Sequence, residues 1–128
     1  MLTAENNADL AALLALTDPA DSTVPAFAAT YQGANIEFDG NIANMMNSGG
    51  YTTRYDILIM AGDYSETTWI GPNFKFADVN ITYDLHLEGP NIPDTIGVGD
   101  NLHIVARVVE YNSTQELFFL EPISTSVR

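Results

Sequence analysis

Aromatic and cationic side chains that could anchor a ligand gather between residues 51 and 75. Tyrosine, tryptophan and arginine are favoured anchors of binding interfaces, because they bury large areas and still offer hydrogen-bond donors. The candidate ligand-binding residues are Tyr51, Arg54, Tyr55, Tyr64, Trp69 and Lys75. Their spacing predicts a site for a polar ligand or a peptide. The alternative interpretation is that the same aromatic rings cover one end of a hydrophobic core.

Histidines and carboxylates could form a metal site. His86 has Asp84 and Glu88 at alternate positions beside it, and His103 lies in a second segment of the same kind. Two histidines and one carboxylate are a known metal-binding set. However, the strand order expected below keeps His86 and His103 apart. We therefore expect surface histidines, no metal site and no cofactor.

Catalytic motifs are missing from the sequence. There is no cysteine, no G-x-S-x-G turn and no glycine-rich phosphate loop. The carboxylates are spread evenly, without a spacing that marks a pair of catalytic acids, and no D-x-D-x-D-G calcium loop occurs. The sequence predicts no catalytic residues and no enzyme, with a small hydrolase as the enzymatic alternative.

The charge balance limits the class of partner. Seventeen acidic side chains oppose four basic ones, which gives a formal net charge of −13. Nucleic-acid binding depends largely on the neutralisation of phosphates by basic groups, and anionic lipids attract basic segments for the same reason. The charge therefore disfavours nucleic acids and anionic membrane surfaces, and leaves proteins and neutral ligands as expected partners.

Length and hydropathy predict a single folded domain. The chain has 128 residues, of which 46% are hydrophobic and 16% charged, so it can bury a core of its own. The apolar stretch within residues 8–16 is too short to span a bilayer. We expect no membrane insertion of this segment.

The first 33 residues carry helical signals. Residues 3–17 are rich in alanine and leucine, with Leu10, Leu13 and Leu14 on one face and Thr3 as a candidate N-cap. Residues 18–25 contain two prolines and predict a loop, and residues 26–33 predict a short helix that ends at Gly33. We divide the chain into an N-terminal helix and linker, residues 1–25, and a β-domain, residues 26–128.

After Gly33 the apolar residues alternate with polar ones, which is typical of strands. Gly40 lies inside the first strand and indicates a bend or bulge. Residues 73–76 could add a minor strand, and a long polar and aromatic loop covers residues 62–73. The five principal strands are predicted at residues 35–46, 51–62, 80–88, 102–109 and 116–124.

Five strands of this hydrophobicity favour a closed barrel, because closure removes exposed strand edges. The predicted fold is mainly β: an OB-fold-like five-stranded barrel with an N-terminal helical extension. In such a barrel the third strand pairs with the fifth, and the fourth pairs with the first. We expect a loop at residues 89–99, where OB-folds commonly place a helix.

The runs YQGANIEFDGNIANM, YTTRYDILIMAGDYSE, GPNFKF, VGDNLHIVARVVEYN and LFFLEPISTSVR resemble an uncharacterised domain-of-unknown-function family found mainly in Gram-positive bacteria. The resemblance covers residues 27–128. A looser likeness, carried by Tyr31, Gly33, Gly40, Gly99 and Asp100, extends to OB-fold domains of the tRNA-anticodon-binding type. Members of that family often end longer chains, some with membrane anchors, so the resemblance implies that this segment comes from a longer protein. An anchored parent chain would place it in the cell envelope or otherwise outside the cytoplasm.

Together these observations predict a non-catalytic binding module for a protein or another ligand that is not a polyanion. The OB-like fold keeps one alternative open, a domain that binds single-stranded nucleic acid. Such domains combine stacking aromatic residues with a basic groove, and this chain has the aromatic residues without the basic charge.

Overall fold

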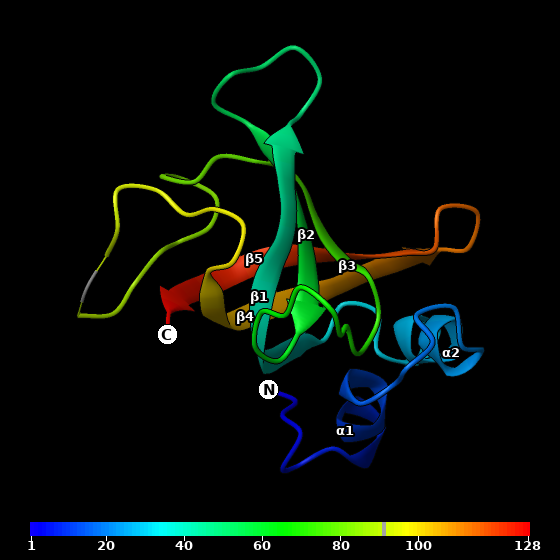
Figure 1. Ribbon diagram of the computed structural model, residues 1–128. Coiled ribbons are helices and arrows are strands. Elements are labelled where there is room, and N and C mark those ends of the chain that lie inside the picture. The colour runs from blue at the N-terminus through cyan, green and yellow to red at the C-terminus, as the bar shows by residue number, and fades with distance from the viewer. Residues whose placement is uncertain (91) are drawn as a thin grey trace.

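Five strands close into a barrel in the computed structural model, which describes residues 1–90 and 92–128 (Figure 1). The order around the barrel is β1-β2-β3-β5-β4, with β4 paired back to β1. Among these strand pairs, β3–β5 is parallel and the other four are antiparallel. The predicted mainly β barrel is confirmed, and the fourth strand pairs with the first as expected. The strands are β1 (Asn35–Asn47), β2 (Tyr55–Ala61), β3 (Phe74–Val79), β4 (Asn101–Asn112) and β5 (Leu117–Val127).

The predicted third strand at residues 80–88 is wrong. The third strand is β3, and the minor strand suggested at residues 73–76 is its beginning. A turn forms after β3 because the side-chain oxygen of Asn80 accepts hydrogen bonds from the backbone N–H groups of Thr82 and Tyr83. Asp84 in turn accepts a 2.7 Å hydrogen bond from the backbone N–H of Asn80. Such local bonds compete with strand pairing, although the alternation of apolar residues suggests a strand.

Residues 80–88 instead contribute to the core from outside the sheet. Ile81 and Leu85 are buried, and Leu87 makes an isolated parallel bridge to Thr125 of β5. The described residues that follow, 89–90 and 92–99, contain no helix or strand, as expected for the loop at 89–99. Residue 91 of that predicted loop lies outside the described residues.

The irregularity expected at Gly40 lies just beyond it, where the register between β1 and β2 shifts between Ile42 and Asn44. Gly40 is the point where β1 passes from pairing with β4 to pairing with β2, because it faces Leu102 on one side and Ala61 on the other. A Cβ atom at Gly40 would lie 2.9 Å from the carbonyl oxygen of Met60 and 3.1 Å from Cγ2 of Ile59. The close approach of β2 therefore requires glycine at this position.

Both helices begin elsewhere than predicted, and the first is also shorter than predicted. α1 is Ala8–Leu14 and α2 is Thr23–Thr30. Asn7, rather than Thr3, caps α1, and its side-chain oxygen accepts a 2.9 Å hydrogen bond from the backbone N–H of Leu10. Pro25 lies in the first turn of α2, where its missing N–H has no helical partner to lose. The predicted boundary between residues 25 and 26 thus falls inside α2.

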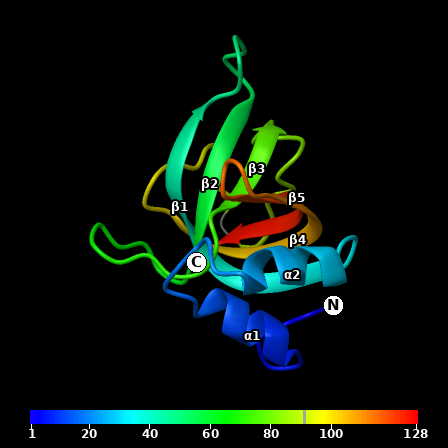
Figure 2. The same cartoon turned by 90° about the vertical axis from the view of Figure 1, so that its right-hand side faces the viewer.

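Both helices share the core of the barrel. α2 lies across one end of the barrel, and α1 packs against the outer side of α2 (Figure 2). Successive aromatic rings continue the core from the barrel into α2, with centroid distances of 4.9 Å for Phe38–Phe74, 5.2 Å for Phe74–Phe118 and 6.2 Å for Phe118–Phe27. Neither of the described helices is long and apolar enough to cross a membrane.

Candidate binding surfaces

The structure separates the six predicted ligand-binding residues into two groups. Tyr51, Arg54 and Tyr55 lie where the β1–β2 turn enters β2, whereas Tyr64 and Trp69 lie in the loop that leaves β2. β2, which begins at Tyr55 and ends at Ala61, runs between the two groups. Lys75, the sixth residue, is on β3. They therefore do not form one site.

The Arg54 side chain is engaged within the protein. Its Nε donates a 2.6 Å hydrogen bond to Asp78, and its Nη2 donates to the Asp78 carbonyl and, at 3.3 Å, to Asp84. The hydrogen bond to Asp78 raises the pKa of Arg54 above its ordinary value. Arg54 thereby joins the β1–β2 turn to the turn that follows β3. Tyr51 beside it is exposed, and Tyr55 is half-buried against the core.

The other three cations also have carboxylate partners. Lys75 Nζ lies 3.9 Å from an Asp56 oxygen and 5.7 Å from the centroid of the Phe119 ring. Arg107 pairs with Glu121 across β4 and β5. Arg128 pairs with Asp63 at 2.8 Å. Every lysine and arginine of the chain is thus neutralised by a neighbouring carboxylate.

Trp69 forms one wall of a groove on the outside of the barrel. The groove measures about 440 Å³, and its floor includes Leu58 and Met60, which face away from the barrel interior. The Trp69 side chain is 55% exposed, so its ring is accessible to a ligand. We call this the Trp69 groove. It is lined by Thr17, Pro19, Ala43, Leu58, Met60, Trp69, Gly71 and Asn73.

Most residues of the Trp69 groove were not predicted as site residues. One signal for them is present in the sequence, because residues 57–60 are apolar at both even and odd positions. A strand that is apolar on both faces must be covered by other parts of the protein on both faces. The barrel interior covers the side of Ile57 and Ile59, and the loop at residues 62–73 partly covers the side of Leu58 and Met60. Tyr64 is outside the groove, and its backbone N–H donates to Asn101 at 2.7 Å.

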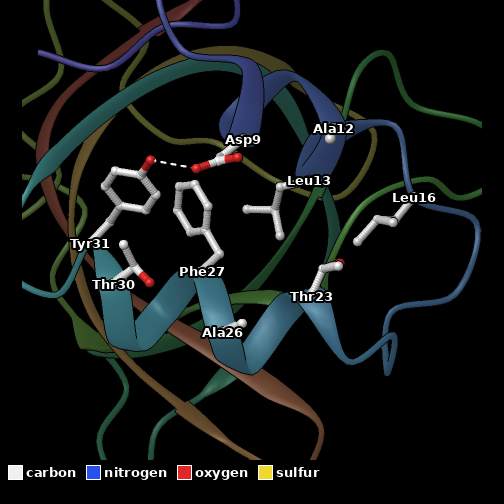
Figure 3. A pocket seen from close by; sticks show the side chains of 9 residues that line it. All are labelled: Asp9, Ala12, Leu13, Leu16, Thr23, Ala26, Phe27, Thr30 and Tyr31. Atoms are coloured by element: carbon white, nitrogen blue, oxygen red, sulfur yellow. Dashed lines mark hydrogen bonds between the residues drawn. The ribbon is translucent and has the colours of Figure 1, made fainter.

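A second groove lies between α1 and α2 (Figure 3). It measures about 270 Å³, and its apolar part includes Leu13, Leu16 and Phe27. Asp9 and Tyr31 close one end, where the Tyr31 hydroxyl donates a 2.6 Å hydrogen bond to the Asp9 carboxylate. We call this the interhelical groove. None of the predicted ligand-binding residues lies in it. α1 and α2 form opposite walls of the groove, and only their packing brings these walls together.

The two histidines occupy separate places. His86 lies in the segment after β3, with a positive φ of 51°. His103 on β4 lies between two carboxylates of β1: Nδ1 is 2.7 Å from Asp39 and Nε2 is 2.8 Å from Glu37. Over residues 1–90 and 92–128, no group of three or more potential ligands is placed to hold a metal ion.

The geometry around His103 selects its charged form. A neutral imidazole has one N–H, so only the doubly protonated ring donates to both carboxylates. The hydrogen bond to Asp39, followed by that to Glu37, raises the pKa of His103 from its ordinary value of 6.5. A histidine whose pKa is raised in the folded state stabilises the fold fully below pH 6.5 and loses this contribution as the pH rises through the raised pKa.

We expect the free energy of unfolding to fall as the pH rises above 6.5, and His103→Gln to reduce this fall. Urea unfolding of both proteins over a pH series measures it. His86→Gln is the matched control, because the His86 side chain makes no hydrogen bond to a carboxylate among the described residues. An equal fall in the wild type and in His103→Gln would show that His103 is not the source of this pH dependence.

Comparison with known proteins identifies a family. A family model described as "Domain of unknown function (DUF4839)" matches residues 5–128, so it includes both helices as well as the barrel. No curated protein matches the chain, and no solved structure does.

Proposed function

Since the chain belongs to this family of domains of unknown function, we propose from its own geometry that it is a non-catalytic module that binds a protein. The Trp69 groove is the proposed site, and it receives apolar side chains of the partner. The observation that carries the proposal is an accessible tryptophan beside an outward-facing apolar floor.

The composition of the groove supports an apolar anchor. Leu58, Met60, Ala43 and Pro19 supply hydrocarbon surface, and Trp69 can stack on an aromatic or aliphatic side chain. Asn73 and Thr17 supply polar groups at the same groove, which can fix the orientation of a peptide backbone. This mixture of a mostly apolar lining with few polar groups is typical of ligand sites.

The charge of the protein supports a neutral or basic partner. The net charge is −13, and all four cations are already paired with carboxylates. A long-range negative potential attracts basic proteins and repels acidic ones. A phosphate chain would have to break several of these ion pairs before it gained a basic contact. Single-stranded nucleic acid, the alternative that the barrel permits, is therefore the less favoured ligand.

Trp69 is the only tryptophan of the chain, so its fluorescence reports directly on the groove. Peptides selected from a random display library should change this fluorescence saturably, and basic peptides with aromatic or large aliphatic residues should dominate the selection. Oligo(dT) and oligo(U) at low salt should leave this fluorescence unchanged. Tight binding of either oligonucleotide that weakens steeply with salt would replace the proposal with its alternative.

Trp69→Ala should weaken the selected peptide at least about tenfold, because truncation of a central aromatic anchor is among the costliest interface changes. Isothermal titration calorimetry measures the affinity without the fluorophore. Tyr83→Ala is the matched control, because Tyr83 is a 76% exposed aromatic residue outside the groove. Equal losses in the two variants, or no loss in Trp69→Ala, would remove the groove as the site.

A further inference from the structure

The interhelical groove combines an apolar channel with one carboxylate at its end. Leu13 and Phe27 form its buried floor, while Ala12 and Ala26 are small residues that leave it open (Figure 3). Tyr31 lies next to Phe27, with 4.5 Å between the ring centroids. A ligand in this groove would therefore meet hydrocarbon along its length and polar groups at one end only.

The carboxylate of Asp9 is held in place before any ligand binds. The Tyr31 hydroxyl donates to Oδ2 of Asp9, and Asn7 Nδ2 lies 3.4 Å from the Tyr31 oxygen. Asn7 is itself immobilised, because it caps α1. These contacts orient Asp9 toward the end of the groove without neutralising its charge, because Tyr31 and Asn7 are both uncharged.

Asp9 keeps binding capacity for a cation. Among the described residues, its Oδ1 accepts no hydrogen bond, and Asp9 takes part in no ion pair with the four lysines and arginines. Desolvated cations also bind well against aromatic rings, and Tyr31 presents one beside the carboxylate. Both features favour a positive charge at this end of the groove.

We propose that the interhelical groove binds the side chain of a lysine on a basic partner protein. The four methylene groups lie along Leu13 and Phe27, and the ammonium group meets Oδ1 of Asp9 and the Tyr31 ring. Lysine fits better than arginine, because a guanidinium prefers two free carboxylate oxygens for its paired donors, and Tyr31 occupies one of them. This site is separate from the Trp69 groove and does not depend on the function proposed for that groove.

Two small probes test the proposal directly. N-acetyl-lysine methylamide has the proposed side chain, and N-acetyl-norleucine methylamide has a similar hydrocarbon chain without the charge. In ¹⁵N-labelled protein, the lysine probe should shift the backbone resonances of Ala12, Leu13, Thr30 and Tyr31. The norleucine probe should bind about threefold to fivefold more weakly, the range expected for an accessible ion pair. Equal binding of the two probes, or shifts outside the groove, would overturn the proposal.

Variants separate the local carboxylate from the overall charge. Asp9→Asn should reduce the affinity for the lysine probe to that for norleucine, whereas Asp94→Asn removes the same charge at an exposed position away from the groove and should have no effect. Ala26→Leu, at an exposed helix position, should fill the groove and abolish binding of both probes. Thermal unfolding confirms that each variant is folded. Equal effects of Asp9→Asn and Asp94→Asn, or undiminished binding in Ala26→Leu, would contradict the site.

Discussion

Gly40→Ala should lower the free energy of unfolding by about 3 kcal/mol, the upper part of the range for overpacked sites. The added methyl group would lie 2.9 Å from the Met60 carbonyl oxygen, which is a backbone atom and cannot rotate away. It would also crowd Ile59 and Phe38, both buried in the core. Relief requires β1 and β2 to separate at the point where β1 leaves β4, so the closure of the barrel is affected.

Urea unfolding measures this effect, with Gly50→Ala as the matched control. Gly50 is in the β1–β2 turn and does not require a positive φ, and a Cβ atom added there would meet no atom within 4 Å. Its substitution should leave the midpoint of unfolding nearly unchanged. A small effect of Gly40→Ala, similar to that of Gly50→Ala, would show that the two strands can separate at little cost.

Arg128→Met should lower the free energy of unfolding by about 2 kcal/mol, because charged hydrogen bonds to partly buried partners are among the stronger ones. The Arg128 guanidinium donates to the carbonyl oxygens of Leu102 at 2.9 Å and Gly40 at 3.1 Å, and to Asp63 at 2.8 Å. Its side chain is 27% exposed, so solvent replaces these contacts only in part. One side chain thus links β4, the Gly40 position of β1 and the loop after β2.

Arg107→Met is the matched control for this prediction. Arg107 pairs with Glu121 across neighbouring strands, and both side chains are at least half exposed. An exposed pair of this kind contributes about 0–1 kcal/mol. The losses in free energy of unfolding, measured in urea, should therefore differ clearly between the two variants. Similar losses would mean that the hydrogen bonds from Arg128 to backbone carbonyls contribute no stability beyond that of an ordinary surface ion pair.

Local sequence patterns predict the structure correctly where only one conformation fits them. Gly40 indicates a bend or bulge because a glycine inside an alternating strand leaves room for a close backbone approach that any other residue would block. β2 makes that close approach, and the register of β1 with β2 shifts just beyond Gly40. The strand prediction at residues 80–88 fails because the alternation there is equally compatible with a turn that buries Ile81 and Leu85. Hydrogen bonds to the Asn80 and Asp84 side chains decide in favour of the turn.

The candidate sites also depend on contacts that local sequence patterns do not predict. Trp69 is a candidate from the sequence, but its neighbours Leu58 and Pro19 come from distant segments that meet only on the folded surface. Arg54 is a candidate binding residue by type, and the structure shows that Asp78 and Asp84 already occupy its donors. The pairing of a cation cannot be read from residue types when carboxylates outnumber cations throughout the chain.

The sequence by itself determined the mainly β class, the closed barrel, an irregularity of the first strand near Gly40 and the excess of negative charge. These are properties of composition and of periodicity along the chain, so they do not require knowledge of which segments meet. Only the tertiary structure decided that Asp9 meets Tyr31, that His103 lies between Glu37 and Asp39, and that every cation has an acidic partner. Those contacts depend on strand register and helix packing, because both bring together residues that are far apart in the chain.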